Sequence, residues 1–228
     1  KNVLLHHDIE FEDGKHSGER ILCADEVVKS PGIPDQATLI IDLKKKGIPV
    51  ISEIEFASRY TRAKLIGVTG SNGKTTTVHL IYHILKNEGL KVGLAGNVDK
   101  SFALQVAQDD QDIFVLELSS FQLDGMFKCR MDIAVLLNIT PDHLDRYKTF
   151  DDYANSKFRI TQNQTEEDLF IYWADDKNIL ERISKSGIKS RQIKFSDKKI
   201  EGEGAYLEND IINININIKE IYYFYFFE

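Results

Sequence analysis

The sequence predicts an α/β protein with a parallel, doubly wound sheet, and three observations support that fold class. From residue 63 onward, short apolar runs alternate with segments of helical periodicity. The runs at 113–118 and 133–139 are apolar throughout, which is typical of strands buried on both faces. A glycine-rich segment at 67–77 lies where a predicted strand meets a predicted helix.

The predicted strands and helices follow one another in a regular order. The helix that begins at Lys74 is expected to end before Gly89, because glycine readily adopts the left-handed conformation that follows a helix. The predicted strands are residues 64–69, 92–95, 113–118, 133–139 and 169–173. The predicted helices are residues 74–87, about 151–161 and about 179–186.

Residues 1–62 hold a shorter α/β pattern. Its parts are a segment at 20–28, the turn Ser-Pro-Gly-Ile-Pro at 30–34, a helix at about 37–46 and a strand at 50–52. We predict that residues 1–62 are the remainder of a small Rossmann-like domain whose opening strand is absent. Residues 63–228 are predicted to form the central, phosphate-loop-containing domain.

The chain ends, at 211–228, in an unusual composition. Ile and Asn alternate, which favours a strand, and six consecutive aromatic residues follow at 222–227. Such a run promotes aggregation unless something covers it. Either a further domain packs there or the tail is not the natural continuation, and composition leaves both readings open.

Composition excludes several classes of protein. The net charge is -7, and no Lys/Arg run has the density of a nucleic-acid-binding patch. No apolar stretch approaches the ~20 residues of a membrane-spanning helix. Cys23 and Cys129 lie far apart without metal-ligand spacing, so we expect free thiols in a reducing compartment. We therefore predict a cytoplasmic protein. Separately, we expect a monomer, although the sequence does not reveal the oligomeric state.

The segment 67–77, GVTGSNGKTTT, is predicted to be a phosphate loop. Glycines let backbone N–H groups approach phosphate oxygens, and the following helix adds the positive end of its dipole. Lys74 would reach the β- and γ-phosphates, and the Thr75 hydroxyl would ligate Mg²⁺. Val68 stands where the strict pattern has its first glycine. An ordinary glycine-rich turn is the alternative, but Gly-Lys-Thr at a helix start has little structural purpose. The residues assigned to the nucleotide are Gly70, Ser71, Asn72, Gly73, Lys74, Thr75 and Thr76.

Two further polar residues follow predicted strands at the sheet edge where ligands bind in parallel α/β folds. Glu117 ends the run 113–118, and beside a phosphate loop its carboxylate is placed to bind Mg²⁺ directly or through water. The alternative is a solvated glutamate at a strand end. Asn97 follows the strand at 92–95 and, by itself, is predicted to be a turn residue.

A third polar cluster, Thr-Pro-Asp-His-Leu-Asp-Arg-Tyr at 140–147, follows the run 133–139. One His, two Asp and an Arg on the same edge could hold a second metal ion and clamp phosphate. Alternatively, Asp142 caps a helix and His143 lies at the surface.

Lys157 lies on the inward face of its predicted helix. The apolar residues Phe150, Tyr153, Ala154 and Phe158 mark that face by their spacing, and Lys157 shares it. An inward lysine needs a partner, a shifted pKa or a chemical modification. The alternative is a lysine that snorkels to the rim.

Together these motifs resemble the Mur ligase family. The loop at 68–77, with its missing first glycine, is similar to the family's phosphate loop, and NITPDHLDR at 138–146 is similar to its second motif. LELSSFQL at 116–123 resembles the version in the member that adds D-glutamate to UDP-N-acetylmuramoyl-L-alanine; relatives that add diaminopimelate or lysine tend to carry Ser-Ser-His there. The turn at 30–34 and Gly96-Asn97 also fit that member. The resemblance covers about residues 1–200.

The resemblance implies roles for individual residues. Lys74 and the loop amides bind ATP, Thr75 and Glu117 hold one Mg²⁺, and His143 helps to bind a second. Lys157 matches the lysine that CO₂ carbamylates in this family, and its carbamate holds that second ion. Asn97 and Ser119 contact the muramoyl substrate. Lys74, His143 and Lys157 are then the catalytic residues.

The sequence also departs from the family pattern. Asp99 stands where the D-glutamate-adding member usually has Gly. The family has three domains, and the resemblance implies that this sequence holds neither the start of the first nor any of the last. We therefore expect the polypeptide by itself to be an incompetent ligase.

The predicted function is an ADP-forming synthesis of an amide bond through an acyl phosphate, with ATP, D-glutamate and the muramoyl substrate as partners. Three alternatives stay open. One is another ligase of the superfamily, including one that glutamylates folate; the Phe121-Gln122 pair argues against it. The others are a nucleotide-dependent regulator and a non-catalytic fragment.

Overall fold

An eight-stranded sheet organises the computed structural model, which describes residues 2–98, 100–108, 110–142 and 146–217. The strand order is β10-β9-β8-β7-β6-β3-β5-β4, and neighbours are parallel except for the antiparallel pair β9 and β10. The strands are β3 (Lys64–Thr69), β4 (Val92–Gly96), β5 (Ile113–Glu117), β6 (Ile133–Leu136), β7 (Leu169–Trp173), β8 (Arg191–Ser196), β9 (Gly204–Glu208) and β10 (Ile211–Asn215). The predicted parallel α/β fold is confirmed.

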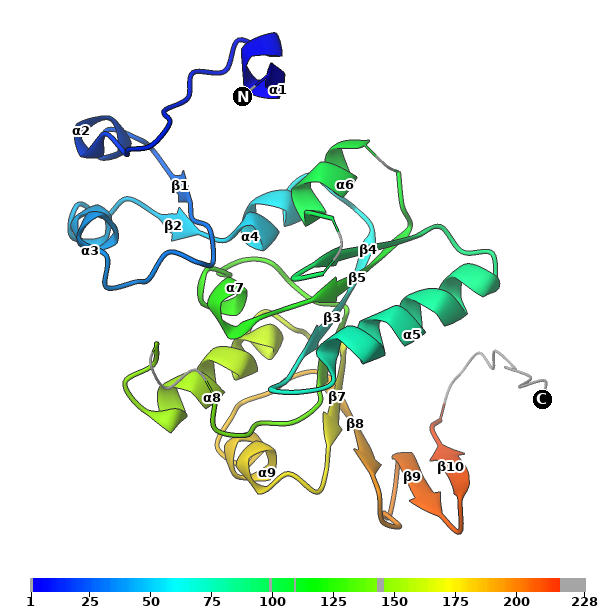
Figure 1. Ribbon diagram of the computed structural model, residues 1–228. Helices are drawn as coiled ribbons and strands as arrows, with labels where there is room; N and C mark the ends of the chain where they lie inside the picture. The colour runs from blue at the N-terminus through cyan, green and yellow to red at the C-terminus, as the bar shows by residue number, and fades with distance from the viewer. Residues whose placement is uncertain (1, 99, 109, 143–145, 218–228) are drawn as a thin grey trace.

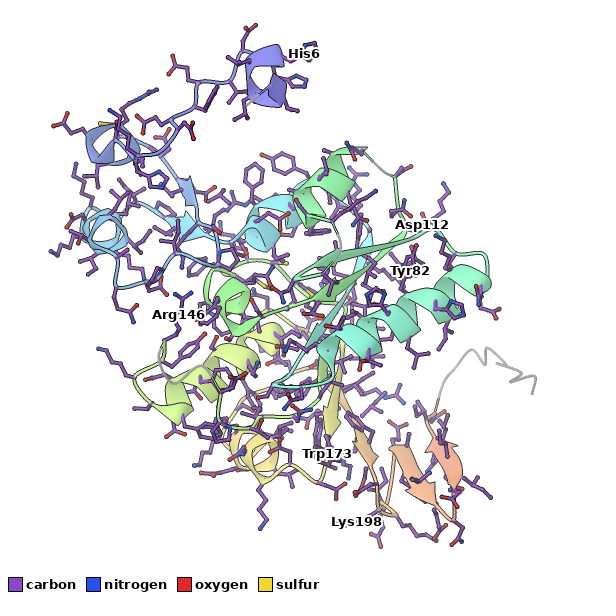
Figure 2. All side chains as sticks on the ribbon, viewed as in Figure 1. His6, Tyr82, Asp112, Arg146, Trp173 and Lys198 are labelled. Carbon is purple, nitrogen blue, oxygen red and sulfur yellow. The ribbon has the colours of Figure 1, made fainter. Side chains whose placement is uncertain are left out.

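Helices cover both faces of this sheet (Figure 1). Successive strand residues face opposite sides, so Leu65 packs in one apolar cluster while Ile66 and Val68 pack in another. Helix α5 (Lys74–Asn87) closes the second cluster, against which Tyr82 packs (Figure 2). The first cluster is closed by α4 (Glu53–Ser58), α6 (Phe102–Gln108), α7 (Ser120–Asp124), α8 (Phe150–Phe158) and α9 (Lys177–Ile183).

Local sequence sets the starts of three of these helices. Ser119 and Gln122 form a capping box at α7, and Thr149 and Asp152 form another at α8. Asp176 caps α9 by accepting from the backbone N–H groups of its first turn. These caps satisfy N–H groups that have no partner within the helix.

The N-terminal segment, residues 2–62, contributes a separate two-stranded parallel sheet of β1 (Val27–Val28) and β2 (Val50–Ile51). Its helices are α1 (Asn2–His6), α2 (Gly18–Ile21) and α3 (Thr38–Lys45), followed by α4. The helix predicted at about 37–46 is therefore present, as is the strand at 50–52 in a shorter form.

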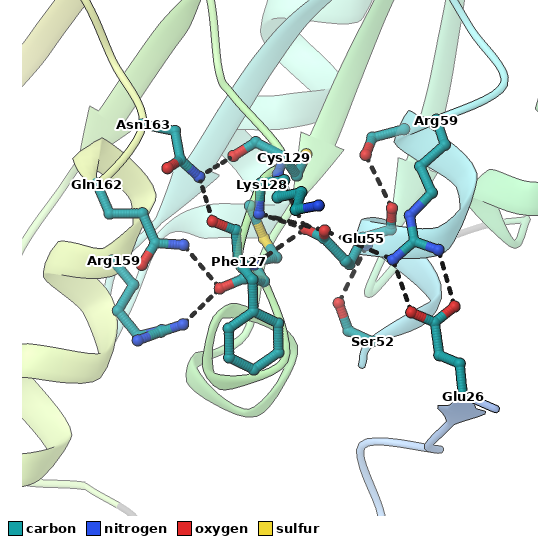
Figure 3. A network of polar contacts seen from close by, with 12 residues as sticks. Glu26, Ser52, Glu55, Arg59, Phe127, Lys128, Cys129, Arg159, Gln162 and Asn163 are labelled. Carbon is teal, nitrogen blue, oxygen red and sulfur yellow. Dashed lines mark hydrogen bonds and ion pairs between the residues drawn. The ribbon is translucent and has the colours of Figure 1, made fainter. Parts of the chain in front are cut away.

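Helix α4 fastens this segment to the large sheet through a buried carboxylate (Figure 3). Glu55 is 1% exposed, and its carboxylate accepts from the backbone N–H groups of Phe127, Lys128 and Cys129 at 2.9–3.2 Å. Arg59, one turn later, donates to Glu26 through both terminal nitrogens. A carboxylate with several backbone donors tolerates burial because its charge is satisfied by hydrogen bonds.

Several predicted boundaries differ from the structure. Strand β6 ends at Leu136 and not at residue 139, because the chain leaves the sheet there and the Ile139 N–H donates to the Asp176 carboxylate. Helix α8 ends at Phe158, and a 3₁₀ turn (Arg159–Thr161) completes the predicted helical stretch. Strands β8 and β9 escaped prediction because their side chains are mostly polar or only half-buried.

The two cysteines are free, Cys23 exposed and Cys129 buried, as predicted. No helix within the described residues is long and apolar enough to cross a bilayer. The Ile/Asn alternation forms the edge strand β10, while the aromatic run at 222–227 lies outside the described residues.

Candidate functional site

The strand order gathers the polar segments that the sequence singled out. Strands β6, β3, β5 and β4 are neighbours and all parallel, so their carboxyl ends lie at one edge of the sheet. The loops that follow β6, β3 and β4 hold Asn138, Gly70 and Asn97, respectively, and Glu117 is the last residue of β5. Chain positions as far as 69 residues apart therefore meet at this edge, as expected for the ligand-binding side of a parallel α/β sheet.

The glycine-rich loop turns from β3 into α5 with two glycines at positive φ. Gly70 has φ 155° and Gly73 has φ 83°, the latter in the left-handed region just before the helix. Asn72, Gly73, Thr75 and Thr76 are exposed at the start of α5. This gives the loop an accessible helix N-terminus with closely approachable backbone, which suits an anion.

Asn138 holds the loop from the neighbouring strand. Its side chain accepts from the Asn72 N–H at 2.8 Å and donates to the Asn72 carbonyl at 3.1 Å. Its backbone carbonyl accepts from the Ser71 N–H at 3.0 Å. The predicted strand 133–139 included Asn138, for which no role was predicted; in the structure β6 ends at Leu136, so that Asn138 follows the strand much as Asn97 follows β4.

Ser71 points inward and not toward solvent. Its hydroxyl donates to the Thr140 carbonyl at 3.0 Å and lies 3.0 Å from the hydroxyl of Tyr153, which is fully buried. Both its backbone N–H and its side chain are thus engaged within the protein. Its predicted contact with a nucleotide stays a prediction.

Lys74 and Lys157 converge on the same loop. Lys74 Nζ donates to the carbonyls of Gly70 at 2.9 Å and Ser71 at 3.1 Å, and Lys157 Nζ donates to the Gly70 carbonyl at 2.9 Å. Lys157 is 2% exposed, and its Nζ lies 4.6 Å from the centre of the Tyr153 ring. The inward orientation predicted for Lys157 is confirmed.

The pKa of Lys157 is lowered to about 7, mainly by burial and to a smaller extent by the nearby positive charge of Lys74. A lysine away from water loses the hydration that stabilises its ammonium form. At neutral pH a substantial fraction of Lys157 is therefore the free amine, which is nucleophilic.

Glu117 joins three of the four strand ends. It is 2% exposed, and its two carboxylate oxygens accept from the Thr75 hydroxyl at 2.7 Å and the Asn97 side-chain amide at 2.9 Å. The Asn97 N–H also donates to the Glu117 carbonyl at 2.9 Å. The alternative of a solvated strand-end glutamate is therefore wrong.

Among the described residues, the hydrogen bonds of Ser119 and Arg146 go to partners outside the phosphate loop. The Ser119 hydroxyl caps α7 by accepting from the Gln122 N–H at 3.3 Å and donating to its side-chain oxygen at 3.0 Å. His143 and Asp99 lie outside the described residues. Arg146, which the sequence suggested as a phosphate clamp, donates to the carbonyls of Pro31 and Gly32.

Comparisons with known proteins identify the family. The sequence profile of the Mur ligase middle domain matches residues 68–223. UDP-N-acetylmuramoylalanine–D-glutamate ligase of Bacteroides fragilis is 60% identical over 210 residues, which are 92% of this chain and 47% of the relative. The ligase of the same name from Christiangramia forsetii is 56% identical over 219 residues, covering 95% of this chain and 49% of the relative. The chain thus spans about half the length of these relatives.

Solved structures share the fold at low sequence identity. The UDP-N-acetylmuramate:L-alanyl-gamma-D-glutamyl-meso-diaminopimelate ligase from Neisseria meningitides superposes with a TM-score of 0.61 at 19% identity, over 93% of this chain and 72% of that one. The MurF ligase from Thermotoga maritima, in complex with ADP, gives 0.52 at 20% identity, over 78% and 52%.

Proposed function

The chain belongs to the Mur ligase family, and we propose that it is the nucleotide-binding core of a ligase that adds D-glutamate to UDP-N-acetylmuramoyl-L-alanine. The relatives that are 56–60% identical over more than nine-tenths of the chain carry that name, which favours D-glutamate over other amino acids. The observation that carries the proposal is the buried Glu117 carboxylate held against Thr75 beside the phosphate loop.

ATP is the proposed nucleotide. The exposed N-terminus of α5 offers backbone N–H groups and a helix dipole to the phosphates, within the predicted set Gly70 to Thr76. Lys74 already lies over the loop, donating to two of its carbonyls, and an incoming phosphate would offer its ammonium a stronger acceptor.

Mg²⁺ fits the donors at Thr75 and Glu117. Both offer hard oxygen atoms, and Mg²⁺ usually takes one or two protein oxygens and completes its shell with phosphate and water. The ion would neutralise charge on the phosphates.

A second ion is proposed at His143 and a carbamylated Lys157. The buried amine of Lys157, with its pKa near 7, can add to CO₂: the amine nitrogen bonds to the carbon and one proton is released, leaving a carbamate anion. That anion would replace an ammonium group with an oxygen donor suited to Mg²⁺.

The proposed reaction has two steps. The L-alanyl carboxylate attacks the γ-phosphate, giving an acyl phosphate and ADP; the amine of D-glutamate then attacks that carbonyl, and phosphate leaves. Lys74 stabilises the charge that develops on the transferred group, so the protein mainly positions and neutralises. Asn97 and Ser119 are proposed to contact the muramoyl substrate.

The wider setting follows from the same proposal. Residues 1–62 would belong to the domain that binds the uridine nucleotide, and residues 63–228 to the central domain. The reaction would serve peptidoglycan precursor synthesis in the cytoplasm, and the protein would act as a monomer.

The deciding experiment measures ADP release by a completed ligase, meaning this chain joined to the parts of the Bacteroides fragilis relative that it does not match. UDP-N-acetylmuramoyl-L-alanine is supplied with D-glutamate, L-lysine, diaminopimelate or no amino acid. Release that requires D-glutamate would establish the function. Release with another amino acid would assign a different ligase, and release without either substrate would indicate a nucleotide-dependent regulator.

A further inference from the structure

Arg146 bridges the large sheet and the N-terminal segment. Its guanidinium donates to the carbonyl of Pro31 at 3.2 Å and to that of Gly32 at 3.3–3.4 Å. In return, the Gln36 side chain donates to the backbone carbonyl of Arg146 at 3.3 Å. These contacts join positions more than 100 residues apart, and Figure 2 shows Arg146 beside α7 on the side facing the N-terminal segment.

The ring of Phe121 packs against the guanidinium of Arg146. The guanidinium carbon lies 4.6 Å from the centre of the Phe121 ring, and the Tyr147 ring stacks on Phe121 at 5.7 Å with an interplanar angle of 5°. The Tyr147 hydroxyl donates to Asp124 at 2.7 Å, which fixes that ring to α7. An arginine laid over an aromatic face keeps its planar fork oriented, so it can donate to two carbonyls at once.

Phe121 lies outside the buried core. Phe121 and Arg146 are both half-buried and line a narrow crevice together with Pro31, Pro34 and Gln36. The second attachment of the N-terminal segment, through Glu55 and Arg59, lies on α4 and does not involve either residue. Loss of the Phe121–Arg146 contact should therefore loosen one loop without unfolding the chain.

We propose that Phe121 and Arg146 form a latch that positions the Ser30–Pro34 loop against the large sheet. In this view Phe121 is a positioning residue: its ring orients Arg146, and Arg146 holds the loop. The kinetic part of the inference rests on the proposed function, because residues 1–62 are there assigned to the uridine nucleotide. Phe121, in the Ser-Ser-Phe-Gln motif, would thus help to hold the N-terminal segment against the large sheet. This role is distinct from a contact with the incoming amino acid.

Hydrogen exchange on the chain itself tests the latch without any ligase activity. Phe121→Leu removes the ring and Arg146→Lys removes the planar fork, and each should speed amide exchange in residues 27–36 roughly fivefold. Phe121→Tyr keeps the ring and should retain the original exchange. Arg182→Gln is the matched control, since Arg182 lies 5.7 Å from the Phe150 ring without reaching the N-terminal segment.

Four results would overturn the latch. Two concern residues 27–36: amide exchange there is unchanged in Arg146→Lys or Phe121→Leu, or it is accelerated equally in Arg182→Gln. The third is an equal acceleration of exchange in β3, which would indicate general loosening, and the fourth is a Phe121→Tyr variant whose exchange equals that of Phe121→Leu. Each of these outcomes is independent of whether the chain serves a ligase.

Steady-state kinetics of the completed ligase give the second readout. Phe121→Leu and Arg146→Lys should raise KM for the muramoyl substrate roughly fivefold while KM for ATP stays unchanged, and Phe121→Tyr should restore the original value. A fall in kcat with unchanged KM would instead place Phe121 against the reacting groups. A completed ligase without activity would contradict the proposed function, while the exchange experiment would still decide the latch.

Discussion

Lys74 and Lys157 share one hydrogen-bond acceptor: the Nζ atom of each lies 2.9 Å from the carbonyl oxygen of Gly70. One amine comes from the start of α5 and the other from α8, and two positive charges so close disfavour each other. Burial is the larger cause that lowers the pKa of Lys157 to about 7, and the charge of Lys74 contributes as well. The two amines therefore differ in environment: Lys74 is half-buried at the start of α5, and Lys157 is buried with a lowered pKa.

Replacing Lys74 with Ala should abolish nucleotide-driven turnover. The substitution removes the ammonium over the loop, and a charge-assisted hydrogen bond to phosphate contributes roughly 1.5–3 kcal/mol. We expect ATP affinity of the chain, measured by calorimetry, to fall roughly tenfold to hundredfold. Lys86→Ala, on the same helix, is the control and should bind normally. Turnover of the completed ligase surviving within about tenfold would count against the loop assignment.

Replacing Glu117 with Gln should weaken Mg²⁺ binding with little change in fold. The amide keeps the shape of the carboxylate, and its single oxygen can still accept from Thr75 while its NH2 group replaces the oxygen that accepted from Asn97; it lacks the negative charge that Mg²⁺ requires. The Mg²⁺ concentration that half-saturates ATP binding should rise roughly tenfold or more. Glu88→Gln, at the far end of α5, should leave it unchanged. An unaltered Mg²⁺ requirement in Glu117→Gln would move the ion elsewhere.

Gly96→Ala should destabilise the chain far more than Gly89→Ala. Both glycines have positive φ, 100° and 81°, so an alanine is strained by about 1 kcal/mol at either. A Cβ at Gly89 meets nothing within 4 Å, whereas one at Gly96 would overlap the Glu117 carbonyl. Urea unfolding should show an additional loss of about 2 kcal/mol at Gly96. Equal losses would mean that β4 can move away from β5 freely.

The buried Lys157 should make folding stability depend on pH. Its folded pKa, about 7, lies below its value of 10.5 in an unfolded chain, so between these values the unfolded state binds more protons and stability rises with pH. Below about pH 7 the destabilisation is fully present. Lys157→Met should therefore stabilise the chain more at pH 6.5 than at pH 9, by about 2 kcal/mol, in carbonate-free urea titrations. A pH-independent difference would show that Lys157 titrates normally.

Labelled CO₂ should modify Lys157. With carbon-13 bicarbonate near pH 8, we expect a carbamate resonance in the carbon-13 spectrum of the chain that is absent from Lys157→Ala. In the completed ligase, small carboxylates should partly restore turnover to Lys157→Ala by supplying the missing anion. Absence of both the resonance and the rescue would contradict the carbamate.

Much of the framework was predictable from local sequence. The β3 strand and the α5 helix have the predicted bounds because Gly70 follows the strand, Gly73 precedes the helix and Gly89 lies just beyond its end. The polar residues after β3, β5 and β6 could be assigned to one sheet edge because parallel strands share direction. Boundaries set by distant partners, such as the end of β6 at Leu136, could not be predicted.

The sequence by itself determined the α/β class, the phosphate loop, the set of strand-end residues and the inward face of Lys157, since each depends on residues close together in the chain. Only the tertiary structure decided how these residues meet. It placed β3 between β5 and β6, so that Glu117 accepts from Thr75 and Asn138 holds Asn72. It also turned Arg146 toward Pro31 and set two lysines on one carbonyl. Strand order and side-chain partners depend on packing between distant segments, and a burial-driven pKa depends on the solvent those segments exclude.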